Sequence, residues 1–523
     1  MEGKHHMKRM IAATLTLALT TAALAGCAAN AAAPTDDQNT VAAATMSNET
    51  GKTPKYVFLF IGDGMSYPQI QSTSDYLGAL NDEDYWQAQP SLDDNQGAIL
   101  DGPEYLNFMN FEGVGTAVTF DSNSFAPDSA STATSIATGH KTYSGSINVD
   151  ETGTVEYETI AEQLKAQKGY EIGVITSVNL NHATPAAFYA HQASRSSYYE
   201  IGLEMVESDF DYFAGGGLLD PTGSEGDQTD LYQLAQEAGY TVARTYAEAD
   251  AISADTDKAI IIEENLADSD AIPYEIDRTD DMWSLADYVE KGIEVLDNET
   301  GFFMMCEGGK IDWACHANDA GSSIHDTQAL ADAVQVAIDF AAEHPDETLI
   351  LVTGDHETGG LTIGFAGTDY DTYLDLLENQ KISYAKFDSD YVASYKENKT
   401  PFEDVLSDIE ELFGLKAQGA ADDKLVLTEY EMEQLRAAYE KSVNGTAASQ
   451  YEQEEYVLYG TYEPLSVTIT HIINNKSGIS FTSYSHTGLP VAVLAEGVGA
   501  ENFSGYYDNT QIYEKMADLL NIA

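Results

Sequence analysis

The chain has 523 residues, 43% of them hydrophobic, which is enough apolar material for one large domain or for two or three smaller ones. Its 87 acidic and 24 basic residues give a formal net charge of −63, and so acidic a surface argues against a nucleic-acid partner. An anionic substrate would need a local source of positive charge, which bound metal ions can supply.

The N-terminus has the features of a lipoprotein export signal. A basic flank, MEGKHHMKRM, precedes the apolar run IAATLTLALTTAALA, which is short for a membrane span and ends in LAGC, the pattern of a bacterial lipobox. We expect residues 1–26 to be a cleaved signal, Cys27 to be lipidated, and residues 27–53 to be a flexible tether. The protein would then be exported and anchored on the extracytoplasmic face of the membrane. The alternative is an ordinary export signal cleaved near the Ala-rich stretch.

Three continuous apolar runs predict strands that are buried on both faces of a sheet. They occupy residues 56–61, 301–306 and 348–353. Each run leads directly into an acidic residue, namely Asp63, Glu307 and Asp355, and His356 follows the last of these. A single acid after a strand is commonly a turn residue or a helix cap, but three such strand ends favour a functional site.

Helical patterns alternate with these strands. They occupy residues 159–167, 284–296 and 327–342. This alternation predicts an α/β fold with a central, mostly parallel β-sheet flanked by helices on both faces. The carboxyl ends of parallel strands share one edge of the sheet, where ligands bind. We therefore expect the acidic residues at the strand ends to meet there.

Residues 368–464 differ in character from the rest of the chain. They are acidic, rich in Tyr and Glu, and contain helical stretches such as FEDVLSDIEELFG and LTEYEMEQLRAAYEKS. We interpret them as a lid or side subdomain inserted into a catalytic domain that covers residues 54–523. Apart from Cys27, the chain contains only Cys306 and Cys315, so a disulfide framework is not expected.

Three further stretches hold candidate functional side chains. PDSASTATS, residues 127–135, is either a linker or contains a nucleophilic hydroxyl. Asp312 and His316 are four residues apart, so on a helix they share a face, where they form either an ion pair or half of a metal site. Their position just after Glu307 favours the metal site. His486, in SHTG, is either a structural histidine or another ligand.

Taken together, the motifs identify a family. FIGDGMS, PDSASTATS, NHATPAAFYAHQASR, EGGKIDWACH, TGDHETGG and SHTG occur here in the order in which they occur in the alkaline phosphatases, which are metal-dependent phosphomonoesterases. The chain resembles this family from about residue 56 to residue 360, and again from about residue 479. The inserted segment has no clear match.

The resemblance implies three metal positions. The first zinc ion (Zn²⁺) would be bound by Asp312, His316 and His486, and the second zinc ion by Asp63, Asp355 and His356. The third position, usually magnesium (Mg²⁺), would be bound by Asp63, Thr184 and Glu307. Carboxylate and imidazole ligands suit zinc, and an all-oxygen set suits magnesium.

The resemblance also implies the catalytic residues. Ser129 would be the nucleophile, at the start of a helix that ends near Gly139, and Arg195 would hold two phosphate oxygens. A phosphoserine would form and then be hydrolysed. The remaining hydroxyls of the stretch are expected to be structural. They are Ser131, Thr132, Thr134 and Ser135.

Two residues depart from the best-known bacterial pattern of the family. His182 and Trp313 replace an Asp and a Lys, as they do in other branches of the family. With Asp128, these residues are expected to lie next to the metal ligands and the phosphate. A histidine at position 182 should weaken magnesium binding at the third position. We expect Cys315 to be a buried small residue and not a ligand.

The sequence leaves two alternative functions open. One is a phosphodiesterase, or another hydrolase of the same superfamily, and the other is a non-catalytic surface lipoprotein with structural metals. A structural site needs no nucleophile, which argues against the second alternative. The expected partners are small phosphorylated substrates, the membrane through the lipid anchor, and a second copy of the chain, since family members are often dimers.

Overall fold

The computed structural model describes residues 52–82, 85, 100–445 and 453–522. The expected signal, Cys27 and nearly all of the tether lie outside these residues. The described residues all belong to one compact unit. Among the described helices, none combines the length and the apolar character needed to cross a membrane.

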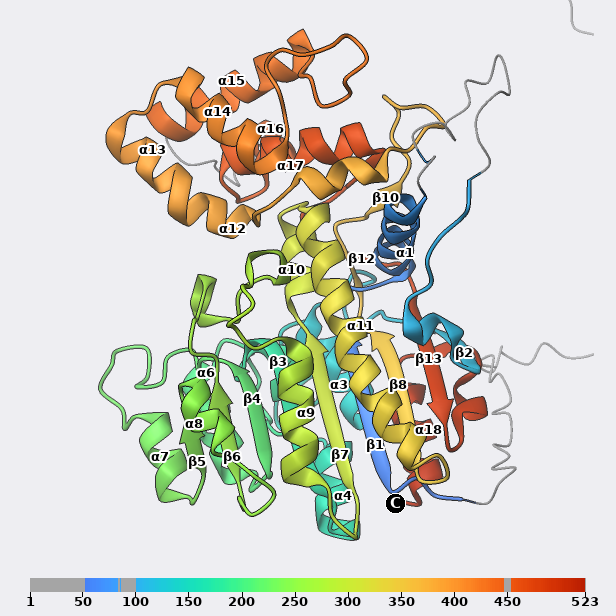
Figure 1. Cartoon of the computed structure of the whole chain (residues 1–523). Helices are drawn as coiled ribbons and strands as arrows, with labels where there is room; N and C mark the ends of the chain where they lie inside the picture. The colour runs from blue at the N-terminus through green and yellow to red at the C-terminus, as the bar shows by residue number, and fades with distance from the viewer. Residues whose placement is uncertain (1–51, 83–84, 86–99, 446–452, 523) are drawn as a thin grey trace, which may run out of the picture. The chain divides into compact units, whose positions relative to one another are not determined.

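A ten-stranded sheet forms the centre of the fold, with the strand order β14-β2-β13-β8-β1-β7-β3-β4-β6-β5 (Figure 1). Of these strands, β13 runs antiparallel to both of its neighbours, and the other recorded pairings are parallel. The strands are β1 (Tyr56–Gly62), β2 (Gly113–Val118), β3 (Glu171–Asn179), β4 (Tyr212–Gly216), β5 (Thr241–Ala243), β6 (Ala259–Ile262), β7 (Phe302–Gly308), β8 (Thr348–Gly354), β13 (Val491–Gly497) and β14 (Gly505–Asp508). The predicted α/β class with a mostly parallel sheet is confirmed.

Helices cover both faces of this sheet, as expected. The α-helices are α1 (Tyr67–Asn81), α3 (Ser129–Thr138), α4 (Ile160–Lys168), α5 (Ala183–Ala186), α6 (Tyr198–Glu207), α7 (Leu231–Glu237), α8 (Tyr246–Asp250), α9 (Leu285–Leu296), α10 (Lys310–His316), α11 (Ala320–Glu343), α12 (Tyr384–Phe387), α13 (Ala393–Asn398), α14 (Phe402–Phe413), α15 (Glu429–Asn444), α16 (Gln453–Tyr459), α17 (Pro464–Ser477) and α18 (Thr510–Leu520). Short 3-10 or π turns and two-residue strands connect them. These are η1 (Asn107–Asn110), η2 (Asp268–Asp270), η3 (Glu275–Asp277), η4 (Leu374–Asn379), η5 (Asp388–Val392), η6 (Ala500–Phe503), β9 (Glu357–Thr358), β10 (Thr362–Ile363), β11 (Ile479–Ser480) and β12 (His486–Thr487).

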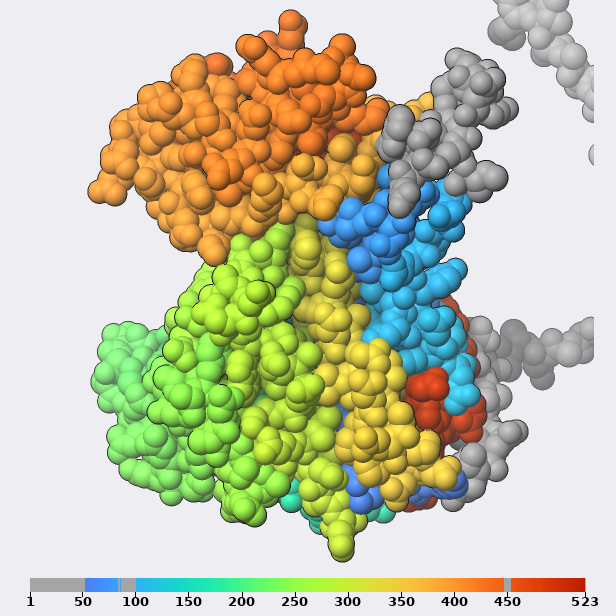
Figure 2. All heavy atoms as spheres, viewed as in Figure 1, coloured from blue at the N-terminus to red at the C-terminus, as the bar shows by residue number. Residues whose placement is uncertain are grey.

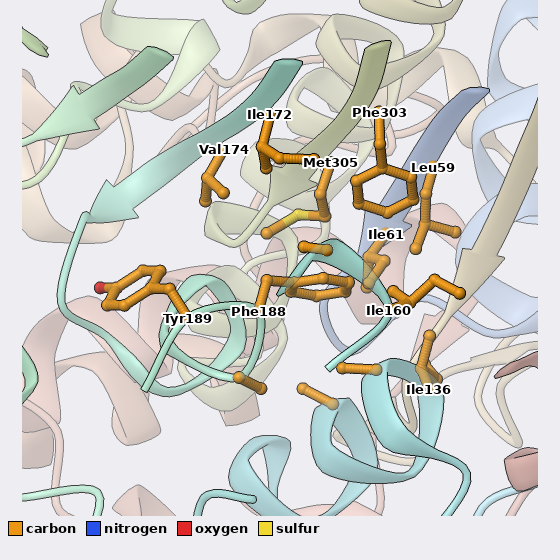
Figure 3. Packing of buried hydrophobic residues seen from close by; sticks show 14 of the residues in the cluster. Leu59, Ile61, Ile136, Ile160, Ile172, Val174, Phe188, Tyr189, Phe303 and Met305 are labelled. Carbon is orange, nitrogen blue, oxygen red and sulfur yellow. The ribbon is translucent and has the colours of Figure 1, made fainter. Parts of the chain in front are cut away.

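The two faces of β1 contribute to two separate cores because side chains alternate along a strand. Leu59 and Ile61 pack with α3, α4 and α18, whereas Phe58 and Phe60 pack with α9 and α11. Figure 3 shows the first of these cores, in which Phe188 lies among side chains of β1 and β7. All four β1 side chains are fully buried, as the continuous apolar run predicts.

Local capping signals set the ends of the predicted helices. Thr159 and Ser284 form capping boxes before α4 and α9, whose bounds fall within a residue of the predicted ones. The third helix, α11, begins at Ala320, seven residues earlier than predicted. Its N-cap Asp319 accepts a hydrogen bond from the Ser322 N–H, and its first turns are small, polar and buried, so they carry no amphipathic pattern.

Residues 368–464 contain the helices α12 to α16 and contribute to a third hydrophobic core. Val405 and Phe413 of α14, Leu435 of α15 and Ile469 of α17 are fully buried in it. Figure 1 and Figure 2 show this orange lobe above the sheet edge at which α10 begins. The same core includes Ile324 of α11, so the lobe packs directly on the sheet domain.

Candidate active site

The site lies at the carboxyl edge of three adjacent parallel strands, β8, β1 and β7. Gly62 at the end of β1 is in register with Gly354 of β8 and with Gly308 of β7. Asp63 and Asp355 directly follow the paired glycines, whereas Glu307 lies opposite Ile61, two positions before Asp63, and all three acids are buried. The sheet topology thus brings the three acidic residues together at one edge, as expected.

Asp63, Asp355 and His356 form a compact cluster that could hold a metal ion. His356 Nε2 lies 3.3 Å from Asp63 Oδ1 and 3.3 Å from Asp355 Oδ2. The N–H groups of Gly64 and His356 donate to Asp355 Oδ1 at 3.1 and 2.8 Å, which fixes the carboxylate. His356 also belongs to a second candidate group with Asp312 and His486.

Asp312 and His316 lie one turn apart on α10, with His316 Nε2 3.3 Å from Asp312 Oδ2. His486 reaches the same place from β12, 3.5 Å from Asp312 Oδ1. The Nδ1 atoms of the two histidines lie 2.6 Å from the carbonyl oxygens of Tyr484 and Pro127, which can only accept a proton. In neutral rings the two Nε2 atoms, 3.0 Å apart, are therefore both acceptors. Two acceptors at this distance repel each other unless a proton or a metal ion lies between them.

Glu307 and Thr184 adjoin the same cluster. Thr184 Oγ1 donates to Asp63 Oδ2 at 3.4 Å, and Thr176 donates to Glu307 Oε2. Glu307 Oε1 is fully buried and has no hydrogen-bond partner among the described residues. An orphaned carboxylate oxygen is costly in a protein interior unless a cation occupies the space beside it.

The electrostatics of the site also favour the binding of a cation. Burial raises the pKa of Asp63 well above its usual range, with the nearby carboxylates adding to the rise. Burial likewise raises the pKa of Asp355 and that of Glu307 to about 7. The pKa of Asp312 is instead below its usual value. Burial acts to raise it, but the three histidines nearby outweigh burial, with His316 acting most strongly, followed by His486 and His356. Metal ions would hold the three raised carboxyl groups in their charged form.

Ser129 is the first residue of α3, directly after the N-cap Asp128. Its side chain is buried, and its Oγ lies 3.1 Å from His356 Nε2 and 3.4 Å from Asp63 Oδ1. The helix ends at Gly139 in a left-handed conformation, as predicted. A hydroxyl at a helix N-terminus faces backbone N–H groups that bind anions.

Arg195 lines the same cavity as Ser129. Its Nη1 donates to Asp128 Oδ2 at 2.8 Å, and its Nη2 lies 3.3 Å from His182 Nε2. Burial, and then the positive charge of Arg195, lowers the pKa of His182 to about 3, so this ring is neutral. The ring of Trp313 meets His182 edge-on, with 5.9 Å between their centroids. His182 and Trp313 thus line the cavity with Arg195, and Asp128 pairs with the guanidinium.

A cavity of about 510 Å³ opens over these side chains. It is lined by Ser129, His182, Arg195, Asp268, Ser269, Asp312, Trp313, His316, Tyr384, Tyr462 and His486. Four of these residues, Asp268, Ser269, Tyr384 and Tyr462, were not predicted from the sequence, because no local pattern links them to the motifs.

Two hydrogen-bond donors to the candidate metal-binding carboxylates were also not predicted. Thr132, expected to be structural only, donates to Asp355 Oδ2 at 3.0 Å, and Thr358 donates to Asp312 Oδ1 at 2.5 Å. Each of these two threonines lies inside a recognised motif, PDSASTATS or TGDHETGG, so the motif was the available signal. Cys315 is buried, with its Sγ 3.3 Å from Ser323 Oγ, and has the expected role of a small packed residue.

Comparison with known proteins identifies the family of the chain. A family model described as alkaline phosphatase matches residues 54–522. The chain belongs to the alkaline phosphatase family. Alkaline phosphatase 3 of Bacillus subtilis is 30% identical over 469 residues, covering 88% of this chain and 87% of that protein. Alkaline phosphatase 4 of the same organism is 29% identical over 462 residues, covering 87% and 86%.

Solved structures agree with this membership. The cold-active alkaline phosphatase of the psychrophile Shewanella sp. has a TM-score of 0.69 and 30% identity, covering 89% of this chain and 99% of that chain. The alkaline phosphatase of the Antarctic bacterium TAB5 has a TM-score of 0.58 and 25% identity, covering 90% and 99%. As a member of a family of phosphoric monoester hydrolases, the chain is an enzyme, and its acidic clusters are candidate metal sites.

Proposed function

We propose that this alkaline phosphatase hydrolyses phosphate monoesters through a covalent phosphoserine on Ser129. The observation that carries the proposal is the position of Ser129 Oγ, at the first residue of α3 and 3.1 Å from His356 Nε2. A hydroxyl at a helix N-terminus, next to a metal-ligand cluster and inside a cavity, has the placement that a phosphoryl acceptor needs.

The reaction has two displacements at phosphorus. In the first, Ser129 Oγ gives up its proton and forms a bond to phosphorus, the bond from phosphorus to the alcohol oxygen breaks, and the departing oxygen takes up a proton and leaves as the alcohol. In the second, a water oxygen gives up a proton and bonds to phosphorus, the bond to Ser129 Oγ breaks, Oγ regains a proton, and inorganic phosphate leaves. Two inversions give net retention of configuration.

Arg195 and the N-terminus of α3 hold the phosphoryl group during both steps. The planar guanidinium can bind two phosphate oxygens at once, and its bond to Asp128 aims it at the cavity. Asp128 also accepts from the Ser131 N–H, so one carboxylate both caps α3 and positions Arg195. Ser129 and Arg195 are therefore both positioned by the N-terminus of α3.

We propose two zinc ions (Zn²⁺) and a magnesium ion (Mg²⁺) as cofactors, because the ligand chemistry fits them. Asp312, His316 and His486 would hold the first zinc ion, and Asp63, Asp355 and His356 the second. Asp63, Thr184 and Glu307 would hold magnesium, which would give the orphaned Glu307 Oε1 a partner. When bound, such ions lower the pKa of a hydroxyl and stabilise the charge of the departing alkoxide.

His182 is expected to weaken the third position. It is a neutral ring beside Arg195, where a carboxylate would attract a cation. Two solved variants of the TAB5 enzyme, in each of which an acidic residue replaces a histidine, are described as having Mg bound in the M3 site. In this chain we propose that His182 leaves the magnesium position partly filled.

We also propose an exported lipoprotein that acts on small phosphorylated substrates. The support for export is the LAGC sequence at 24–27 after an apolar run, with Cys27 as the lipidated residue. The compact unit that starts at Ser47 supports a catalytic domain over 54–523 that contains the insertion at 368–464. From the family resemblance we also propose that the chain forms a homodimer. Light scattering, which measures the mass of the protein in solution, tests this proposal.

The test of the central proposal compares p-nitrophenyl phosphate with its bis-ester. We expect hydrolysis of the monoester, and Ser129→Ala to lose it by at least about three orders of magnitude. Ser135→Ala is the matched control on the same helix, because Ser135 Oγ bonds only to the backbone of its own helix. Full activity in Ser129→Ala would refute the mechanism, and preference for the diester would favour the phosphodiesterase alternative.

A further inference from the structure

Part of the cavity wall is aromatic and comes from two regions of the chain. Trp313 lies on α10, whereas Tyr384 begins α12 and Tyr462 follows α16, so both tyrosines belong to the insertion. The rings of Tyr384 and Tyr462 lie 5.7 Å apart at 85° to each other. Figure 1 shows α12 and α16 in the orange lobe above α10. The insertion thus completes the cavity that contains Ser129.

This aromatic wall is backed by a buried ion pair. Lys310 is fully buried, and its Nζ donates to Asp268 Oδ1 at 2.6 Å. The same Nζ lies 4.6 Å from the centre of the Trp313 ring and 4.1 Å from that of Tyr274. The Asp268 carboxylate lines the cavity and keeps 29% of its side chain exposed. The wall therefore presents aromatic rings together with an accessible carboxylate.

Carboxyl groups surround the ammonium group behind this wall. Asp268, Asp277 and Asp326 all act on Lys310. Burial raises the pKa of both Asp277 and Asp326. Asp268 is the one of the three that lines the cavity. Arg195, the other cation of the cavity, is paired with Asp128.

We propose that this wall binds the alcohol portion of the substrate and that it selects small alcohols carrying an ammonium group, as in phosphocholine. The inference rests on the proposed phosphomonoesterase function and adds a substrate class to it. Ring faces attract a cation through their quadrupole, and a nearby carboxylate adds a direct charge interaction.

A planar base as the leaving group is the competing interpretation of the same rings. Stacking of a base between two side chains requires ring faces that are nearly parallel. Tyr384 and Tyr462 are almost perpendicular, which is the arrangement of walls around a compact cation. The observed angle therefore favours the ammonium group.

The test uses phosphocholine and its neutral isostere, 3,3-dimethylbutyl phosphate, on the metal-loaded enzyme. The two substrates differ in charge and not in shape, so the ratio of their kcat/KM values isolates the contribution of the cation. We expect phosphocholine to be favoured about tenfold, within the range of a partly desolvated cation–π contact. Equal values would overturn the inference while leaving the phosphomonoesterase proposal intact.

Variants locate the effect in the wall. Tyr462→Leu should bring the ratio close to one, whereas Tyr462→Phe should keep it, because the ring face is what binds the cation. Tyr430→Leu is the matched control, since Tyr430 lies on α15 of the same insertion and is 69% exposed outside the cavity. An unchanged ratio in Tyr462→Leu would overturn the assignment.

Two other outcomes are decisive. Adenosine monophosphate turned over at a tenfold higher kcat/KM than phosphocholine would overturn the inference in favour of base stacking. Failure to hydrolyse p-nitrophenyl phosphate and both test substrates would overturn the phosphomonoesterase proposal and, with it, this inference.

Discussion

The substitution His191→Gln tests the ion pairs that His191, shortly before Arg195 in the chain, forms with Glu162 and Glu204. His191 Nε2 lies 3.5 Å from Glu162 Oε2, and its Nδ1 lies 3.7 Å from Glu204 Oε2. The backbone N–H of His191 also donates to Glu204. Burial would lower the pKa of His191, but the two glutamates raise it to about 10. The ring is therefore charged in the folded enzyme at neutral pH.

The sign of the pH effect follows from the raised pKa. The charged ring stabilises the fold fully below about pH 6.5, its unfolded pKa, and this contribution is lost as the pH rises through about 10. A rise of this size corresponds to at most about 5 kcal/mol of the free energy of unfolding. Because the side chains of Glu162 and Glu204 are 29% and 24% exposed, solvent screening reduces the expected effect to about 2–3 kcal/mol.

Chemical denaturation of the wild type and His191→Gln between pH 6 and pH 10 measures this difference. We expect the wild type to be more stable by about 2–3 kcal/mol at pH 6, and the gap to shrink steadily toward pH 10. Ser135→Ala should follow the pH dependence of the wild type, because it removes no titrating group. A gap between the wild type and His191→Gln that stays constant over this pH range would refute the reasoning.

Three other predictions address the metals and the core. EDTA should abolish turnover and lower the Tm, because the buried carboxylates of Asp63, Asp355 and Glu307 would lose their counter-charge. Zinc-saturated EDTA is the control. Full activity in a sample that mass spectrometry shows to be free of metal would contradict the prediction. His182→Asp should raise the magnesium content of the purified enzyme toward one ion per chain, and an unchanged metal analysis would argue against a role of this ring at the third position. Phe303→Ala should lower the free energy of unfolding by about 3–5 kcal/mol, since Phe303 is fully buried against Phe188, whereas Phe125→Ala, 86% exposed, should change it by less than about 0.5 kcal/mol.

The strand ends and helix caps of this enzyme could be predicted because their signals are local. Three apolar runs that each stop at an acid specify both buried strands and the edge where Asp63, Glu307 and Asp355 meet. Thr159 and Ser284 mark helix starts for the same reason. The start of α11 was missed because its first turns pack on other elements and show no amphipathic period.

The aromatic part of the cavity wall could not be predicted because it depends on long-range packing. Tyr384 and Tyr462 lie far from every motif in the sequence, and only the fold of the insertion brings them to Ser129. Thr132 illustrates the same limit on a smaller scale. Its position in α3 was predicted, but its hydrogen bond to Asp355 depends on how α3 meets β8.

The short pairing of β12 with β9 has a consequence for how the enzyme matures. His486 lies opposite Thr358 in this pairing, although the whole insertion separates the two residues along the chain. A chain that emerges from its N-terminus therefore carries every other candidate ligand before His486 arrives. The proposed metal position that includes His486 can therefore be completed only after the lobe has been synthesised, whereas the group of Asp63, Asp355 and His356 is already present in the chain before it.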